Sequence, residues 1–148
     1  MAAVEAHDRE AWLALFADDA VVEDPVGPSL FDPEGAGHRG PEAIASFYDT
    51  VIAANESIRF DIRQSFLCGD EAANVGVIRI TFADGSGVEV DGVYTYRRSP
   101  DGRIAAMYPE PFALMSLLSR TGSPLAIGAR TSHPDICSMA SGWSVRRT

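Results

Sequence analysis

The order of hydrophobic and polar residues changes its period partway along the chain. Over residues 9–17 and 41–52, apolar side chains recur at the three- and four-residue spacing that is typical of one face of a helix. From residue 58 onward, apolar and polar side chains alternate, which is typical of half-buried strands. The pattern therefore predicts helices first and strands afterwards, an α+β arrangement.

Two helices are predicted in the first part. Asp8 suits the N-cap of a helix over residues 9–17. Pro41 suits the first turn of a second helix that reaches residue 52. The apolar face of this second helix comprises Ile44, Phe47, Tyr48, Val51 and Ile52. Between the helices, residues 21–24 read as a short strand that Pro25 ends.

The second part predicts a run of strands joined by short turns. We expect strands over residues 58–63, 73–82, 88–98 and 103–109. Glycine and aspartate mark the turns between them, as in Asp84–Gly85. Strands with short connections pair antiparallel, so we expect a curved antiparallel sheet with the helices packed on its concave face. Such a cone leaves room for an apolar pocket between helices and sheet.

Composition and charge narrow the possible partners. The chain has 148 residues, 46% of them hydrophobic and 22% charged, which suits one folded domain. Its net charge of −9 argues against nucleic acid and anionic membranes as partners, and no apolar run is long enough to span a bilayer. The two cysteines, Cys68 and Cys137, form no disulfide framework, so we expect a cytoplasmic protein.

The last part of the chain differs from the rest. Residues 111–148 contain a single acidic residue, Asp135, and four arginines, together with seven serines. We therefore expect a folded domain over residues 1–112 and a weakly ordered extension over 113–148.

Three segments carry a resemblance to a known family. The run over residues 15–27, which ends in Glu-Asp-Pro-Val-Gly, resembles the bacterial ketosteroid isomerases. The segments 40–44 (Gly-Pro-Glu-Ala-Ile) and 102–104 (Gly-Arg-Ile) look like the following helix and the entry to the last strand of that family. The resemblance covers about residues 4–110 and is closest to a mycobacterial branch. It implies the cone-shaped fold of the NTF2-like, or SnoaL-like, superfamily.

The resemblance also implies a chemistry. In these isomerases a carboxylate moves a proton between two carbons beside a ketone, and hydrogen-bond donors hold the dienolate; no cofactor or metal is needed. A homodimer is usual in the family. The family's first-helix tyrosine stands further before the base than Met1 does here, so we expect a truncated first helix, or a start other than Met1.

Asp24 matches the family's general base. Alternation along the short strand puts Val22 and Asp24 on one face, so an inward Val22 implies an inward Asp24. A buried carboxylate with no obvious arginine partner favours a functional role. The alternative is an Asp-Pro turn whose carboxylate binds nearby backbone amides.

Tyr48 and Asp91 are the other candidate catalytic residues. By resemblance, Tyr48 supports the oxyanion-binding tyrosine, although a helix-face aromatic is more often plain core. Asp91 is the candidate for the protonated acid of the oxyanion hole, but it lies one residue out of the family's register with Tyr96. A bulge at Gly92 would restore its direction; otherwise Asp91 is an exposed carboxylate paired with Arg79 or Arg97.

Seven apolar residues are candidates for substrate binding, and any of them could be core instead. They are Phe16, Val22, Phe47, Phe60, Phe82, Val93 and Met107. The leading hypothesis is a steroid Δ-isomerase-like enzyme that acts on a steroid or similar polycyclic ketone with Asp24 as the base. The alternatives are a non-catalytic module that binds an apolar ligand or a protein, and a cyclase or epoxide-opening enzyme. No residue spacing predicts a metal site.

Overall fold

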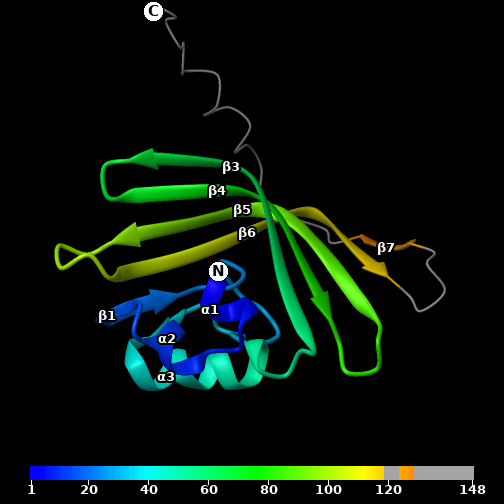
Figure 1. The fold of residues 1–148 in the computed structure, drawn as a ribbon, viewed down its shortest axis with the longest axis horizontal. Coiled ribbons are helices and arrows are strands. Elements are labelled where there is room, and N and C mark those ends of the chain that lie inside the picture. The colour runs from blue at the N-terminus through cyan, green and yellow to red at the C-terminus, as the bar shows by residue number, and fades with distance from the viewer. Residues whose placement is uncertain (119–123, 129–148) are drawn as a thin grey trace, which may run out of the picture.

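The structure is a computed structural model that describes residues 1–118 and 124–128. Short helices form one layer, and a long, bent sheet curves over them (Figure 1). The helices lie within the concave side of the sheet, so the α+β fold expected from the change of period is confirmed.

The helical layer has four short elements. They are α1 (Ala2–Glu5), α2 (Arg9–Leu13), α3 (Gly40–Phe47) and a π-helical turn, η1 (Tyr48–Ile52), that continues α3. Asp8 caps α2, because its Oδ1 accepts a hydrogen bond from the backbone N–H of Ala11 at 2.9 Å.

The second predicted helix corresponds to α3 and η1. It has its expected extent, with a π-helical last turn.

The first predicted helix was too long. α2 ends at Leu13, and the chain turns into a strand instead of continuing to Ala17. The backbone N–H of Ile104 donates to the carbonyl of Leu15 at 2.7 Å, and Phe16 pairs with Ile104. Apolar residues such as Leu15 and Phe16 fit either period, and here pairing with a distant strand determines the structure.

Within the described residues, the sheet has seven strands. They are β1 (Phe16–Val22), β2 (His38–Arg39), β3 (Ser57–Cys68), β4 (Glu71–Thr81), β5 (Gly87–Arg98), β6 (Ile104–Leu118) and β7 (Pro124–Gly128). Their order is β2-β1-β6-β5-β4-β3, and β7 pairs with β6. The sheet is not wholly antiparallel as expected, because β1 runs parallel to β6.

The last strand runs further than the sequence pattern predicted. β6 extends to Leu118, so the expected domain boundary at residue 112 falls inside a strand. β7 belongs to the expected extension but pairs with β6. The rest of that extension, residues 119–123 and 129–148, lies outside the described residues.

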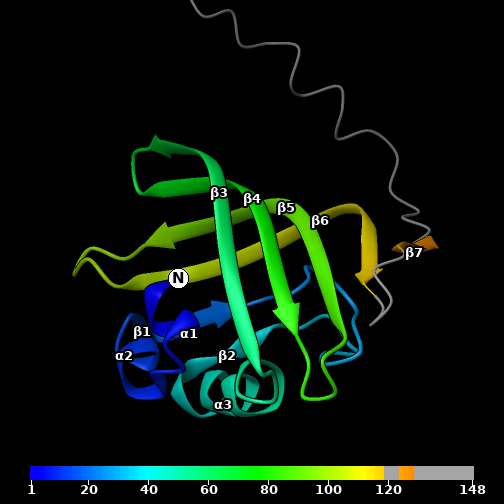
Figure 2. The same ribbon diagram turned by 45° about the vertical axis from the view of Figure 1, so that its right-hand side comes forward.

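Two glycines lie opposite each other on neighbouring strands of the sheet. Gly76 of β4 lies opposite Gly92 of β5, and a Cβ at Gly76 would stand 2.3 Å from the backbone oxygen of Asp61. No side chain could fit there, so the strands approach closely at this point. On the other side of β4, Arg63 of β3 is skipped in the pairing, which is a bulge. The strands then sweep over the helices (Figure 2).

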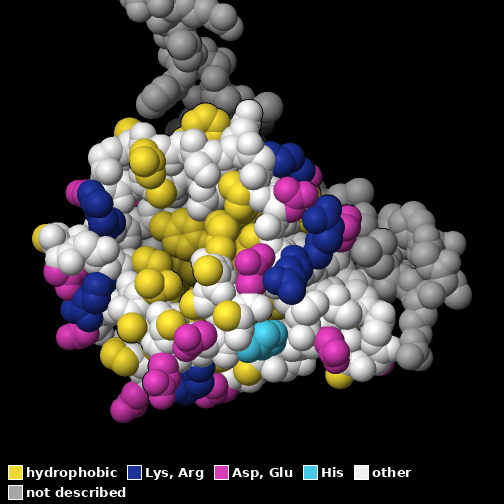
Figure 3. All heavy atoms as spheres, viewed as in Figure 1, with side chains coloured by type: hydrophobic (Ala, Val, Ile, Leu, Met, Phe, Trp, Pro, Cys, Tyr) yellow, Lys and Arg dark blue, Asp and Glu magenta, His cyan; other side chains and the backbone are white. Residues whose placement is uncertain are grey.

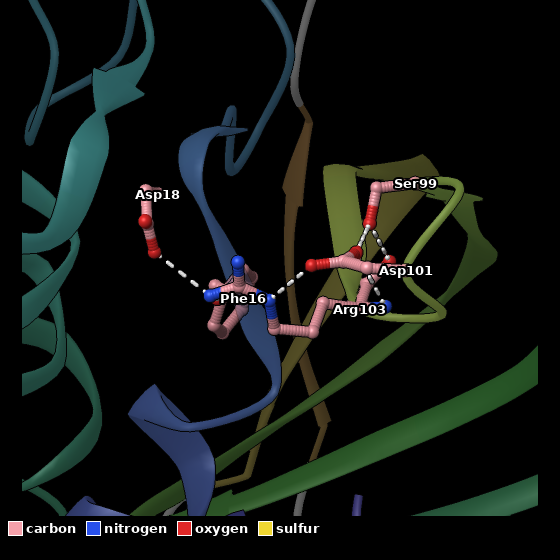
Figure 4. A network of polar contacts seen from close by, with 5 residues as sticks. All are labelled: Phe16, Asp18, Ser99, Asp101 and Arg103. Carbon is pink, nitrogen blue, oxygen red and sulfur yellow. Dashed lines mark hydrogen bonds and ion pairs between the residues drawn. The ribbon is translucent and has the colours of Figure 1, made fainter.

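Polar contacts fasten the start of β1 to the β5–β6 turn (Figure 4). Arg103 donates from Nη1 to the carbonyl of Phe16 at 3.2 Å and to Oδ1 of Asp18 at 2.8 Å. Its Nε donates to Oδ2 of Asp101 at 2.7 Å. These contacts hold the Phe16 backbone beside Ile104, so the aromatic side chain is directed into the core.

Candidate active site

A cavity of about 110 Å³ lies between the helices and the concave face of the sheet. Trp12, Phe47, Val51 and Ile52 line it from the helical layer. Phe60, Ile78, Ile80 and Met107 line it from the strands. In the space-filling view, apolar side chains gather in a hollow at the centre of this face, with charged side chains around it (Figure 3). The cavity therefore suits an apolar ligand.

Four of the seven candidate substrate-binding residues line this cavity, namely Phe16, Phe47, Phe60 and Met107. The structure does not bring the other three to the cavity wall. Val22 is fully buried in the core beneath it. Phe82 follows β4 and is only partly buried, and Val93 is an odd-numbered residue of β5. Strand alternation puts Val93 on the opposite face from Tyr94, which does line the cavity.

Asp24 is the acidic residue of the cavity wall among the described residues. It stands two residues beyond β1, where the backbone N–H of Glu23 donates to the carbonyl of Met107 at 3.0 Å. The following peptide bond, to Pro25, is cis. β1 and β6 together therefore hold Asp24 on the wall of the apolar cavity.

The environment of Asp24 disfavours the charged form of its carboxyl group. Burial raises the pKa of its carboxyl from 3.8 to about 6, because the charged form loses water and gains no compensating cation. In the described part of the chain, no hydrogen bond or ion pair reaches this carboxylate. The structure therefore does not have the alternative, an Asp-Pro turn in which the Asp24 carboxylate accepts hydrogen bonds from nearby backbone amides.

Two tyrosines of the cavity wall were missed by the sequence analysis. Tyr94 and Tyr96 are alternate residues of β5, so both face the concave side. Burial, with a smaller contribution from the charge of Asp24, raises the pKa of each phenol to about 12. The alternation around Tyr94 and Tyr96 is visible in the sequence, but no local pattern shows which face of β5 is concave.

Asp91 lies on the convex face, not in the cavity. Its Oδ1 accepts a hydrogen bond from Nη2 of Arg63 at 2.6 Å, and both side chains are nearly half exposed. The pairing of β5 with β6 is irregular beside Gly92, yet this does not turn Asp91 inward. The expectation that Asp91 completes the site is therefore corrected, and its partner is neither Arg79 nor Arg97.

Tyr48 is a core residue close to the site but not part of its wall. It is 2% exposed, and its ring lies 5.2 Å from that of Trp12, centroid to centroid. Its hydroxyl oxygen is buried with no hydrogen-bond partner in the described structure. Burial raises the pKa of this phenol. The structure does not bring the Tyr48 hydroxyl to Asp24.

Asn55 adds one polar group to the wall, at the end of the helical layer. Its Nδ2 donates to the carbonyls of Val51 at 2.5 Å and Ile52 at 3.3 Å. The amide thus completes the last turn of η1, which explains why no pattern in the sequence marked it as a site residue. Its role is to end the helix beside the cavity.

Residues 1–118 and 124–128 contain neither a cluster of metal-binding side chains nor a membrane-spanning helix. No group of three or more histidine, cysteine, aspartate or glutamate side chains there could hold a metal ion. No helix in this part of the chain is long and apolar enough to cross a membrane.

Comparison with known proteins identifies the family. The SnoaL-like domain family matches residues 1–107. No curated protein sequence matches the chain. The solved structure of RV0760c from Mycobacterium tuberculosis is 42% identical, with a TM-score of 0.72, and the match covers 78% of this chain and 88% of that one. The same protein in complex with estradiol-17β-hemisuccinate is 44% identical over 73% of this chain and 84% of that one, with a TM-score of 0.68.

Two more solved structures bear on the site. The Δ5-3-ketosteroid isomerase of a Mycobacterium species is 41% identical, with a TM-score of 0.69 and coverage of 74% of this chain and 84% of that one. A computationally designed binder of 17-OHP is 40% identical, with a TM-score of 0.70 and the same coverage. The chain therefore belongs to the SnoaL-like domain family and has the NTF2-like fold.

Proposed function

We propose that this protein is a cofactor-independent isomerase that moves a carbon–carbon double bond next to a ketone, with Asp24 as the general base. The observation that carries the proposal is a carboxylate without a protein partner on the wall of an apolar cavity, with its pKa raised to about 6. At pH 7 about nine in ten such carboxyls are ionised, so the group is available as a base while its basicity exceeds that of an ordinary aspartate.

The proposed reaction needs no added reagent. The Asp24 carboxylate takes a proton from the carbon between the ketone and the double bond. The C–H electron pair forms a new double bond, and the carbonyl π pair moves to the ketone oxygen, which gives a dienolate. The protonated Asp24 then returns the proton to the far end of the diene system, so atoms and electrons balance and the base is regenerated.

We propose a steroid or a similar polycyclic ketone as the substrate class. The wall is aromatic and aliphatic apart from a few polar groups, which favours a large, rigid, apolar ligand. The cavity of about 110 Å³ would take the reacting end, and the remainder would lie in the hollow seen in Figure 3. Relatives at 40–44% identity include a ketosteroid isomerase, a complex with an estradiol derivative and a designed steroid binder, which supports this class.

One observation favours a second candidate, a non-catalytic module that binds an apolar ligand. Asp91, the expected second donor to the dienolate, is on the convex face. Loss of one such donor typically slows an enzyme by about a hundred- to a thousandfold. A chain with Asp24 but no donor could hold a steroid without turning it over.

A direct assay separates the two candidates. A β,γ-unsaturated 3-ketosteroid becomes a conjugated enone when the double bond moves, and the product absorbs in the ultraviolet. We expect turnover by the protein and a loss of at least about a hundredfold for Asp24→Asn. Asp61→Asn is the matched control and should keep full turnover, because the exposed Asp61 carboxylate pairs with Arg79 and lies outside the cavity. Steroid binding without turnover by the unmodified protein would instead support the binding module.

The proposal includes a homodimer that pairs through the outer face of the sheet, and a cytoplasmic location. Light scattering measures the mass in solution, and twice the mass of one chain is expected. A monomer at micromolar concentration would contradict the dimer and leave the proposed reaction untouched.

A further inference from the structure

The alternation of β5 places two phenols on the cavity wall. Tyr94 and Tyr96 line the cavity, whereas Asp91, three and five residues before them, is on the convex face with Arg63. Even-numbered positions of this part of β5 thus face inward and odd-numbered positions face outward. A hydrogen-bond donor for a ligand in this cavity should therefore come from an even-numbered position.

The two phenols differ in what their hydroxyls do. Tyr94 donates its proton to the backbone carbonyl of Val90 at 2.7 Å. The hydroxyl of Tyr96 makes no hydrogen bond within the described residues. A phenol that is largely removed from water gains from a partner, because an unmade hydrogen bond leaves the polar group desolvated. Tyr96 thus has a donor available for a ligand, and Tyr94 does not.

Tyr96 also lies within the field of the proposed base. The charge of Asp24 adds to burial in raising the pKa of the Tyr96 phenol to about 12. At neutral pH this phenol is protonated and can donate. In a ketone, the α-carbon is only two bonds from the oxygen. A base and a hydrogen-bond donor on the same cavity wall can therefore reach the α-carbon and the oxygen, respectively.

We propose that the Tyr96 hydroxyl is the hydrogen-bond donor that holds the ketone oxygen of the substrate, as a catalytic residue beside Asp24. This inference rests on the proposed function. When Asp24 removes the proton from carbon, negative charge grows on the ketone oxygen. Tyr96 keeps its own proton and its hydrogen bond to that oxygen strengthens, which lowers the barrier. The hydrogen-bond donor to the ketone oxygen would then be a phenol on β5, and not a carboxylic acid.

The first test uses binding alone, so it remains valid if the protein has no turnover. Estradiol carries a phenol that resembles the dienolate, and its 3-deoxy analogue lacks that oxygen. Calorimetry should show that Tyr96→Phe reduces the preference for estradiol over the analogue by about tenfold. Tyr108→Phe should keep the preference, because Tyr108 lies between the cavity-lining Met107 and Pro109 and faces away from the cavity. An unchanged preference in Tyr96→Phe would overturn the inference.

The second test uses turnover of a β,γ-unsaturated 3-ketosteroid. Tyr96→Phe should lower kcat by about a hundred- to a thousandfold with little change in KM, because the hydrogen bond matters most in the transition state. Tyr108→Phe is the matched control: Tyr108 lies between the cavity-lining Met107 and Pro109, so it faces away and its variant should have normal kcat. A normal kcat in Tyr96→Phe would contradict the inference.

The outcomes keep the two proposals apart. If the unmodified protein does not isomerise the ketosteroid, the proposed function fails, and the estradiol pair alone decides the role of Tyr96. If the protein isomerises it and Tyr96→Phe is fully active, only the role of Tyr96 fails. Matching circular dichroism of the Tyr96→Phe variant and the unmodified protein checks that the variant is folded.

Discussion

Arg63 and Asp91 form an ion pair on the convex face of the sheet, with 2.6 Å between Nη2 and Oδ1. Arg63 is the bulged residue of β3, and its side chain reaches past β4 to Asp91 of β5. The pair thus holds Asp91 on the side of the sheet opposite Asp24. An acidic residue that resembles part of an oxyanion hole in sequence is a surface residue in the structure.

Asp91→Asn should leave catalysis unchanged. The ion pair is exposed to water, so its loss should also change the thermal unfolding midpoint very little. Steady-state kinetics with a ketosteroid and a thermal unfolding curve measure both effects. A fall in kcat of a hundredfold or more would mean that Asp91 reaches the substrate, against its position in the structure.

Tyr48→Phe should give a protein that is as stable as the unmodified one or more stable, by up to about 1 kcal/mol. The Tyr48 hydroxyl is buried with no partner, so its removal takes away a desolvated polar group and leaves the ring packed on Trp12. Urea unfolding measures the difference, and kcat should remain within a few-fold. A large loss of kcat with normal stability would restore Tyr48 to the catalytic site.

Asp24→Asn should stabilise the protein at neutral pH. Burial raises the pKa of Asp24 from 3.8 to about 6, so the folded state binds a proton more tightly than the unfolded state does. The stabilisation from this proton is complete below about pH 3.8 and is lost as the pH rises through 6. At pH 8 the asparagine variant should exceed the unmodified protein by up to about 3 kcal/mol. Urea unfolding of both proteins at pH 4, 6 and 8 measures the difference in their free energies of unfolding. This difference should move in favour of Asp24→Asn as the pH rises, and a move in favour of the unmodified protein would contradict the prediction.

The sequence predicted the strands and turns of the second half well. Alternation over β3, β4 and β5 is regular, and Gly69 and Gly85 lie in the turns with positive φ, a conformation that favours glycine. These elements are determined by neighbouring residues, so local patterns suffice. The exceptions are the ends of two strands. β3 stays paired with β4 as far as Cys68, beyond the predicted residue 63, and β6 extends beyond the predicted residue 109, where it pairs with β7.

The start of β1 was missed because its cause is distant in sequence. Phe16 enters the sheet through a parallel pairing with Ile104, supported by the contact of Arg103 with the Phe16 carbonyl. A window of neighbouring residues contains neither partner, so Leu15 and Phe16 looked like the continuation of a helix. Long-range pairing of this kind cannot be deduced from a local pattern.

The residues of the candidate site likewise divide into one that the local sequence predicts and two that depend on the fold of the sheet. An inward Asp24 followed from its spacing to Val22, and both Val22 and Asp24 are directed inward in the structure. Tyr94 and Tyr96 required knowledge of which face of β5 is concave, and that depends on how the bulged sheet bends over the helices. The resemblance suggested the carboxylate of Asp91 as a site residue, but the alternation of β5 places Asp91 on the convex face. The same alternation places the phenols of Tyr94 and Tyr96 on the concave face.

The central claim is that Asp24 is a base on the wall of an apolar cavity, without a protein partner, and its own titration tests this most directly. Carbon-13 NMR of labelled aspartate carboxyls, with Asp24→Asn to assign the signal, measures the pKa of this one group. We predict a midpoint near pH 6, matched by a rise in kcat/KM with the same midpoint. A midpoint near pH 4 would mean that the carboxyl is solvated or paired, and would contradict the account.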